Sequence, residues 1–208
     1  MLIKMQVNDL LDDLASASPA PGGGSVAALS GALSAGLIAM VCRLTIGKKG
    51  LEEHNEQLQD VLARVEALRS ELAVLIDLDT EAFNGVMAAF KMVKASDEEK
   101  ASRSAAIQDA FMQAVEVPLR TAKTCGELLT LALEIGEVAN PNCISDLGVA
   151  GQSAFAGFRG GIMNVRINLP SIKDVGFSES TTAVVAQLAT EADKRHRDLE
   201  QIVNERLV

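Results

Sequence analysis

A run of 18 residues without a charged side chain, residues 25–42, constrains the fold of this 208-residue chain more than any other stretch. On a helix drawn through the run, small residues recur at every fourth position on one side and large apolar residues on another. The small row is Ala27, Gly31, Ala35 and Ala39, and the large row is Leu29, Leu33, Leu37 and Val41. We therefore predict a buried helix with a second helix close against its small row. A membrane span is the alternative, at the lower limit of length, but the serines and glycines make the run poorly apolar.

Two prolines and three consecutive glycines precede this run, within residues 19–24. Glycine is costly to order, so we expect the backbone there to turn sharply or to approach something closely. The sequence GGGSVA has the spacing of the dinucleotide fingerprint, but that motif needs a preceding strand and a βαβ unit. Prolines and a helical pattern surround it here instead. The remaining interpretation is a turn at a helix N-terminus that offers free N–H groups to an anion or a carbonyl, with a plain helix entry as the alternative.

Helical periodicity and helix caps recur along the chain, whereas β-type alternation of useful length does not. We therefore predict an all-α, single-domain helical bundle with long buried helices over residues 1–208. The expected helices cover residues 8–15, 25–47, about 52–94, 96 onward, 145–169 and about 178 to the end. Ser96 and Glu99 have the spacing of a capping box, and we expect Pro118 to kink or restart the helix that follows.

The helix predicted after the loop VANPNCISD also contains five glycines, in SDLGVAGQSAFAGFRGGIMNVRINL. Ser153, Gly157 and Gly161 form one row of it at every fourth position. Each glycine inside a helix costs roughly 1 kcal/mol relative to alanine. Two glycine-rich helices therefore predict close backbone approach, either between them in one subunit or across the interface of a homodimer.

Composition excludes several classes of protein. The net charge is −9 and the chain has no Trp and no Tyr, which argues against a nucleic-acid partner, since that needs a basic surface and stacking aromatic rings. Cys42, Cys125 and Cys143 are an odd number at wide spacings, which indicates neither a disulfide framework nor a zinc site. The first residues lack the apolar block of a secretory signal. We therefore expect a cytoplasmic protein without a metal.

Few side chains are available for acid–base chemistry, because the chain has no tyrosine and only two histidines. His54 and His196 lie in strongly polar runs, and we interpret both as solvated. Asp77 and Asp79 interrupt the apolar stretch LIDLDTEAFN, and half-buried carboxylates with shifted pKa values are site candidates; a solvated polar stripe is the alternative. On a helix they point about 200° apart, so one helix cannot aim both at the same atom. Asp146 is a weaker candidate, since it also suits a helix first turn without any function.

Three stretches resemble the cyclodeaminase/cyclohydrolase family: SPAPGGGSVAALSGALSAGLIAMVCRLTIGKK, DLDTEAFNGVMAAF and NPNCISDLGVAGQSAFAGFRGGIMNVRINL. That family comprises the C-terminal domain of formiminotransferase-cyclodeaminase and the stand-alone methenyltetrahydrofolate cyclohydrolases. The resemblance extends from about Val7 to the last helix, and MVCRLTIGKK together with NCISDLGVAGQSAFAGFR is closer to the stand-alone enzymes. Gly50 departs from the pattern, because many members carry a bulky residue after the lysine pair.

The resemblance implies a helical homodimer that acts on a one-carbon tetrahydrofolate without a metal, nucleotide or other cofactor. In the cyclohydrolase, water adds to the methenyl carbon between N5 and N10, and the adduct opens to 10-formyltetrahydrofolate. In the cyclodeaminase, the alternative, N10 attacks a formimino carbon and ammonia departs. A folate-binding helical dimer without catalysis is a further alternative.

The resemblance also implies roles for particular residues. A carboxylate can stabilise the cationic one-carbon unit while a second one transfers the proton, and Asp79, Asp77 and, less directly, Asp146 are the candidates. We favour Asp79 as the catalytic one. The expected substrate-binding residues are Gly22, Gly23, Gly24 and Ser25 against the flat pterin, Lys48, Lys49 and Arg159 for the glutamate tail, and Thr80, Asn142 and Ser145 from the matched motifs.

Overall fold

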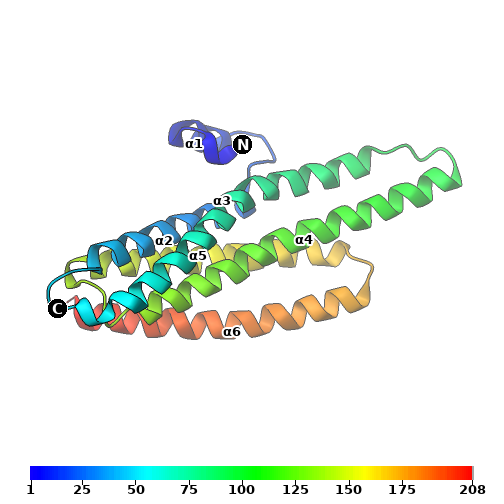
Figure 1. Ribbon diagram of the computed structural model, residues 1–208. Helices are drawn as coiled ribbons and strands as arrows, with labels where there is room; N and C mark the ends of the chain where they lie inside the picture. The colour runs from blue at the N-terminus through cyan, green and yellow to red at the C-terminus, as the bar shows by residue number, and fades with distance from the viewer. Residues whose placement is uncertain (208) are drawn as a thin grey trace.

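Six α-helices make up most of the computed structural model, which describes residues 1–207 (Figure 1). They are α1 Val7–Ala15, α2 Gly23–Thr45, α3 Asn55–Lys91, α4 Asp97–Glu134, α5 Ile144–Asn168 and α6 Val175–Arg206. Five are long and lie roughly along one direction, while α1 stands apart at the edge of the bundle (Figure 1). The described residues contain no strand, so the predicted all-α class is confirmed.

The antiparallel pair of α2 and α5 forms the centre of the bundle, with α3 packed on α2 and α4 packed on both α3 and α5. The two backbones approach so closely that a Cβ placed on Gly157 would lie 2.7 Å from the carbonyl oxygen of Ala27. Further along the same contact, Ser34 Oγ donates to the carbonyl oxygen of Ala150 at 2.7 Å. The close approach predicted for the glycine-rich helices therefore occurs inside one chain.

Helix α2 is long and apolar enough to cross a membrane by length and composition, but 56% of its most apolar window is buried inside the fold. Its small row is buried between neighbouring helices, since Ala27 lies against Gly160 of α5. A Cβ on Gly31 would meet Cys125 of α4 and Leu72 of α3. Its core residues include Ile38 and Val41, both with no exposed surface. This is the pattern of a core helix. The three cysteines are also buried as free thiols, and burial raises the pKa of Cys42 to about 11 and that of Cys125 to about 12.

Helix α4 opens with the predicted capping box, in which Ser96 and Glu99 exchange hydrogen bonds. It then continues as one helix through Pro118 to Glu134, so of the predicted kink or restart at Pro118 the restart does not occur. Proline has no N–H, which leaves the carbonyl of Ala114, four residues back, without its helical donor. The side chain of Asn168 on α5 supplies a donor instead, because its Nδ2 lies 3.0 Å from that carbonyl oxygen.

Helix α6 begins at Val175, capped by Asp174, three residues before the start expected near Ser178. Its buried face includes Leu199 and His196, and His196 is only 9% exposed. The imidazole stacks on the ring of Phe155 with 4.1 Å between ring centroids. The prediction of a solvated His196 is therefore wrong, because the charged residues beside it in sequence point to the other sides of the helix.

Candidate active site

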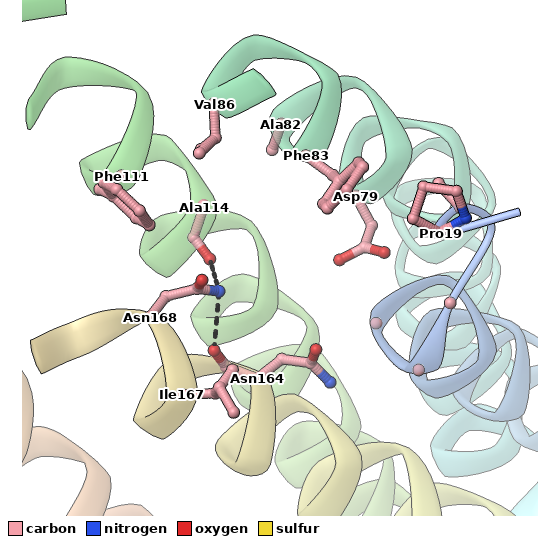
Figure 2. A pocket seen from close by; sticks show the side chains of 14 residues that line it. Pro19, Asp79, Ala82, Phe83, Val86, Phe111, Ala114, Asn164, Ile167 and Asn168 are labelled. Carbon is pink, nitrogen blue, oxygen red and sulfur yellow. Dashed lines mark hydrogen bonds between the residues drawn. The ribbon is translucent and has the colours of Figure 1, made fainter. Parts of the chain in front are cut away.

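A cavity of about 330 Å³ lies where the start of α2, the middle of α3 and the end of α5 meet (Figure 2). Its lining includes Gly22, Gly23 and Gly24 from α2 and its approach, Asp79 and Phe83 from α3, Phe111 and Ala114 from α4, and Asn164 and Asn168 from α5. Binding pockets for small molecules commonly start at about this volume. Four of the residues predicted from the sequence, the three glycines and Asp79, meet in this one place.

Among the described residues 1–207, Asp79 is the one ionisable side chain in the lining of the cavity. Burial raises the pKa of its carboxyl group, and hydrogen bonds from Ser25 partly offset that effect. A Cβ placed on Gly24 would lie only 1.9 Å from Oδ1 of Asp79, so the carboxylate occupies the space that any side chain at position 24 would need. Gly24 is required here because Asp79 approaches the backbone at the start of α2.

Ser25 and Thr80 support Asp79 from outside the cavity. The Ser25 hydroxyl is buried and lies 3.0 Å from Oδ2 of Asp79 and 2.9 Å from the carbonyl oxygen of Ile76. Thr80 Oγ1 lies 3.3 Å from the same hydroxyl. A hydroxyl has one hydrogen to donate. When Thr80 donates a hydrogen bond to Ser25, the Ser25 hydroxyl donates its own hydrogen to Asp79 or to Ile76. In this chain both residues position the carboxylate and neither lines the cavity.

Asp77 faces away from the cavity, as the angle between successive helical positions predicts. Its Oδ1 accepts a hydrogen bond from the backbone N–H of Leu2, in the short 3-10 helix Leu2–Lys4. Its Oδ2 is buried and has no hydrogen-bond partner among residues 1–207. Asp77 therefore holds the N-terminal segment against α3, while Asp79 points to the cavity.

Two asparagines on α5 complete the polar wall of the cavity, and sequence reasoning missed both. Asn168 Nδ2 donates to the carbonyl oxygens of Ala114 and Asn164, each at 3.0 Å. Asn164 Nδ2 donates to the carbonyl oxygen of Gly160 at 2.9 Å. Their spacing of four residues at the end of an apolar helix is the signal that could have indicated a shared face.

The remaining predicted residues lie elsewhere in this chain. Helix α2 has 23 residues and is therefore roughly 35 Å long. Lys48 and Lys49 follow its far end, where Lys48 contacts Asn140. The 3-10 helix Pro141–Cys143, which contains Asn142, and the start of α5, which contains Ser145 and Asp146, come directly after Asn140. Lys48 Nζ donates to Oδ1 of Asn140, whose Nδ2 in turn donates to the carbonyl of Leu44 at 3.1 Å. The structure thus separates this group from Asp79 within one chain, and its role stays a prediction.

Two further features lie outside the cavity. Arg159 on α5 is 3.6 Å from Asp193 Oδ1 and lies over the ring of Phe155, so its predicted contact with a glutamate tail also stays a prediction. Ser145 lines a second hollow of about 320 Å³ between α5 and α6.

Among residues 1–207 no group of three or more His, Cys, Asp or Glu side chains is placed to hold a metal ion.

The arrangement around Asp79 is suited to proton transfer. A raised pKa lies closer to neutral pH, which makes the carboxylate a better proton acceptor. The first residues of α2, Gly23 and Gly24, line the same cavity at the positive end of the helix dipole. The aromatic rings of Phe83 and Phe111 on the other walls suit a flat ligand (Figure 2).

Comparison with known proteins places this geometry in context. The family model for formiminotransferase-cyclodeaminase matches residues 6–187. The methenyltetrahydrofolate cyclohydrolase of Methylorubrum extorquens is 45% identical over 186 residues, which cover 89% of each chain. The formimidoyltransferase-cyclodeaminase of Rattus norvegicus is 34% identical over 191 residues, and the match covers 92% of this chain but only 35% of the rat protein.

A solved structure has the same fold. The crystal structure of formiminotetrahydrofolate cyclodeaminase from Thermotoga maritima superposes with a TM-score of 0.88, covering 99% of this chain and 98% of that one at 26% sequence identity.

Proposed function

Because this chain belongs to the formiminotransferase-cyclodeaminase family, we propose that it is a methenyltetrahydrofolate cyclohydrolase, which converts 5,10-methenyltetrahydrofolate and water to 10-formyltetrahydrofolate. The observation that carries the proposal is the 45% identity to the Methylorubrum extorquens cyclohydrolase, which covers 89% of both chains. The rat cyclodeaminase is less similar, at 34% identity, and matches over 35% of its length.

Asp79 is the proposed general base of this reaction. The water oxygen bonds to the methenyl carbon, and one of its protons passes to the Asp79 carboxylate. The bond from that carbon to N5 then breaks as Asp79 gives its proton to N5, and the remaining hydroxyl releases its proton to water as the formyl carbonyl forms on N10. One proton is released overall, because a cationic substrate becomes a neutral formyl group. The buried position of Asp79, which raises its pKa, supports this assignment.

Electrostatic complementarity supports the same role. The methenyl group of the substrate carries a positive charge shared by N5 and N10, and the ionised Asp79 is the anionic side chain of the cavity lining. A carboxylate fixed in a half-buried site attracts such a cation more strongly than it would in solvent. The hydrogen bond from Ser25 at 3.0 Å holds the carboxylate in place before the substrate arrives.

The other walls suit the pterin ring. Phe83 and Phe111 offer aromatic surfaces, and Gly22 and Gly23 let the backbone come close to a flat ligand. A cavity of about 330 Å³ suits the bicyclic ring with its one-carbon bridge, so the glutamate tail extends toward the protein surface.

We further propose that the enzyme is a homodimer through the exposed faces of α2 and α5. Large apolar side chains line up on the free side of α2, where Leu33 is 59% and Leu44 52% exposed. On the adjacent side of α5, Val149 is 55%, Met163 61% and Ile167 75% exposed. An apolar strip that runs the length of two neighbouring helices is typical of a protein interface.

A twofold axis across the middle of α2 would bring the two distant groups of predicted residues together. In such an isologous dimer, each end of α2 lies beside the opposite end of the partner's α2. The lysine pair of one protomer, Lys48 and Lys49, would then approach the cavity of the other, where it could bind the anionic glutamate tail. In this arrangement each folate site would be shared, with Asp79 from one subunit and the lysine pair from the other.

The cyclodeaminase reaction is the second candidate, and the fold similarity to the Thermotoga maritima enzyme favours it. In that reaction N10 attacks the formimino carbon and Asp79 assists the departure of ammonia. Both reactions need the same kind of carboxylate. A cytoplasmic location is part of the proposal, because three buried free thiols suit a reducing compartment.

The test is to incubate the purified protein separately with 5,10-methenyltetrahydrofolate and with 5-formiminotetrahydrofolate and to follow both absorbance spectra. A cyclohydrolase consumes the methenyl compound faster than the buffer does. A cyclodeaminase forms the methenyl compound from the formimino substrate and releases ammonia. Binding of either compound without turnover would instead support a non-catalytic folate-binding protein.

A further inference from the structure

The proline inside α4 determines the orientation of an amide in the cavity. Pro118 donates no N–H to the carbonyl of Ala114, so that carbonyl is open to another donor. Asn168 Nδ2 takes this place at 3.0 Å and donates its second hydrogen to the carbonyl of Asn164, also at 3.0 Å (Figure 2). Both hydrogens of the amide are therefore committed to protein carbonyls.

This network leaves one orientation for the Asn168 amide. A flipped amide would set its oxygen against two carbonyl oxygens, with no hydrogen to share. The remaining polar atom, Oδ1, accepts no hydrogen bond from residues 1–207, and Asn168 lines the cavity. Oδ1 is therefore a fixed acceptor that is available to a ligand, and it cannot act as a donor.

We propose that Asn168 is a specificity-determining residue that accepts a hydrogen bond from the 2-amino group of the pterin. The inference rests on the proposed folate function. On the pyrimidine side of a pterin the 2-amino group is the outward donor, and a fixed acceptor recognises such a group without having to reorient. Asn168 is half-buried, and a bound ligand without that donor leaves Oδ1 covered and unpaired, which costs affinity. Asn168 thereby also sets which end of the ring enters the cavity first.

The experiment measures kcat/KM for 5,10-methenyltetrahydrofolate and for its 2-desamino-2-methyl analogue, in which a methyl group replaces the 2-amino group. The wild-type enzyme should prefer the natural substrate by about 10-fold, as expected for one half-buried polar group left unpaired. Asn168→Ala and Asn168→Leu both remove the acceptor, and the leucine keeps the same number and branching of side-chain heavy atoms. In either variant the preference should fall to about twofold or less. Val86→Ala, which removes apolar volume from another wall of the cavity, should keep the wild-type preference.

The preference is a ratio measured within one enzyme preparation, so a loss of folded protein does not change it. No preference in the wild-type enzyme, or an undiminished preference in a folded Asn168 variant, overturns the inference while leaving the cyclohydrolase proposal intact. If the wild-type enzyme acts on neither folate compound, the proposed function fails and this inference fails with it.

Discussion

The carboxylate of Asp79 occupies the space that a side chain at Gly24 would need: a Cβ at position 24 would lie 1.9 Å from Oδ1 of Asp79 and 2.4 Å from its Cγ. Asp79 can therefore approach the start of α2 only because the third residue of the GGG sequence has no side chain. This contact explains why the last residue of the glycine run is glycine, although glycine is costly to order at a helix entry.

Gly24→Ala should displace the Asp79 carboxylate and lower kcat by about 100-fold, within the range for loss of a proton-transfer group. Gly23→Ala is the matched control, because its Cβ would meet Asn164 Nδ2 at an ordinary 3.7 Å. Since Gly23 lines the cavity, its substitution should raise KM and leave kcat within about threefold. Steady-state kinetics on both variants, with thermal melts, measures the difference. Equal kcat values for the two variants would refute the role assigned to the Gly24 contact.

Asp77→Asn should leave catalysis intact and weaken the attachment of the N-terminal segment. The carboxylate accepts the N–H of Leu2 and lies outside the cavity. Hydrogen bonds to charged groups contribute about 1.5–3 kcal/mol, and an amide oxygen retains part of that. We expect the free energy of unfolding to fall by about 1 kcal/mol, measured by urea denaturation, with kcat within about twofold of the wild-type value. A loss of turnover without a loss of stability would place Asp77 in the active site.

The effect of Asp79 on stability should depend on pH. Burial raises its pKa in the folded state, so its stabilising contribution is complete below the pKa of an unfolded aspartate, about 3.9, and is lost as pH rises through the folded value. Near pH 7 the wild-type protein carries a buried charge that Asp79→Asn lacks. The variant should therefore have the higher Tm at pH 7, and thermal melts should show this advantage shrinking toward pH 4. An advantage that is constant with pH would contradict the direction of the shift.

A charge on the free face of α2 should dissociate the proposed homodimer. Leu33 is 59% exposed in the single chain and lies in the middle of the apolar strip. Light scattering at micromolar concentration should give twice the 21.9 kDa of one chain for the wild-type protein and a monomer for Leu33→Asp. Val93→Asp is the control, because Val93 is 68% exposed at the turn between α3 and α4 and should leave the dimer intact. A monomeric wild-type protein would refute the dimer.

Local patterns allowed much of this fold to be predicted. The buried helix of residues 25–42, the capping box of Ser96 and Glu99, and the divergence of Asp77 from Asp79 all follow from periodicity and spacing within one helix. The buried environment of His196 could not be predicted in this way, because its polar neighbours in sequence lie on other faces of α6.

The rest of the site depends on pairs of distant residues. Asn168 reaches the cavity only because α5 runs antiparallel to α2 and packs on α4, and its orientation depends on a proline 50 positions earlier in the sequence. Nothing local to Asn168 shows that the carbonyl of Ala114 lacks a helical donor. The separation of the lysine pair from Asp79 by the length of α2 likewise becomes visible only in three dimensions.

The central claim is that Asp79 is the general base of a methenyltetrahydrofolate cyclohydrolase, and the most direct test is the turnover of that substrate by Asp79→Asn. The substitution keeps the shape of the side chain and removes its charge and proton affinity. With a melting curve that shows a folded protein, kcat should fall by about 10²–10⁴, and the residual rate should no longer decline as pH falls through the raised pKa of Asp79. A folded Asp79→Asn variant that retains wild-type turnover and its pH profile would contradict the claim.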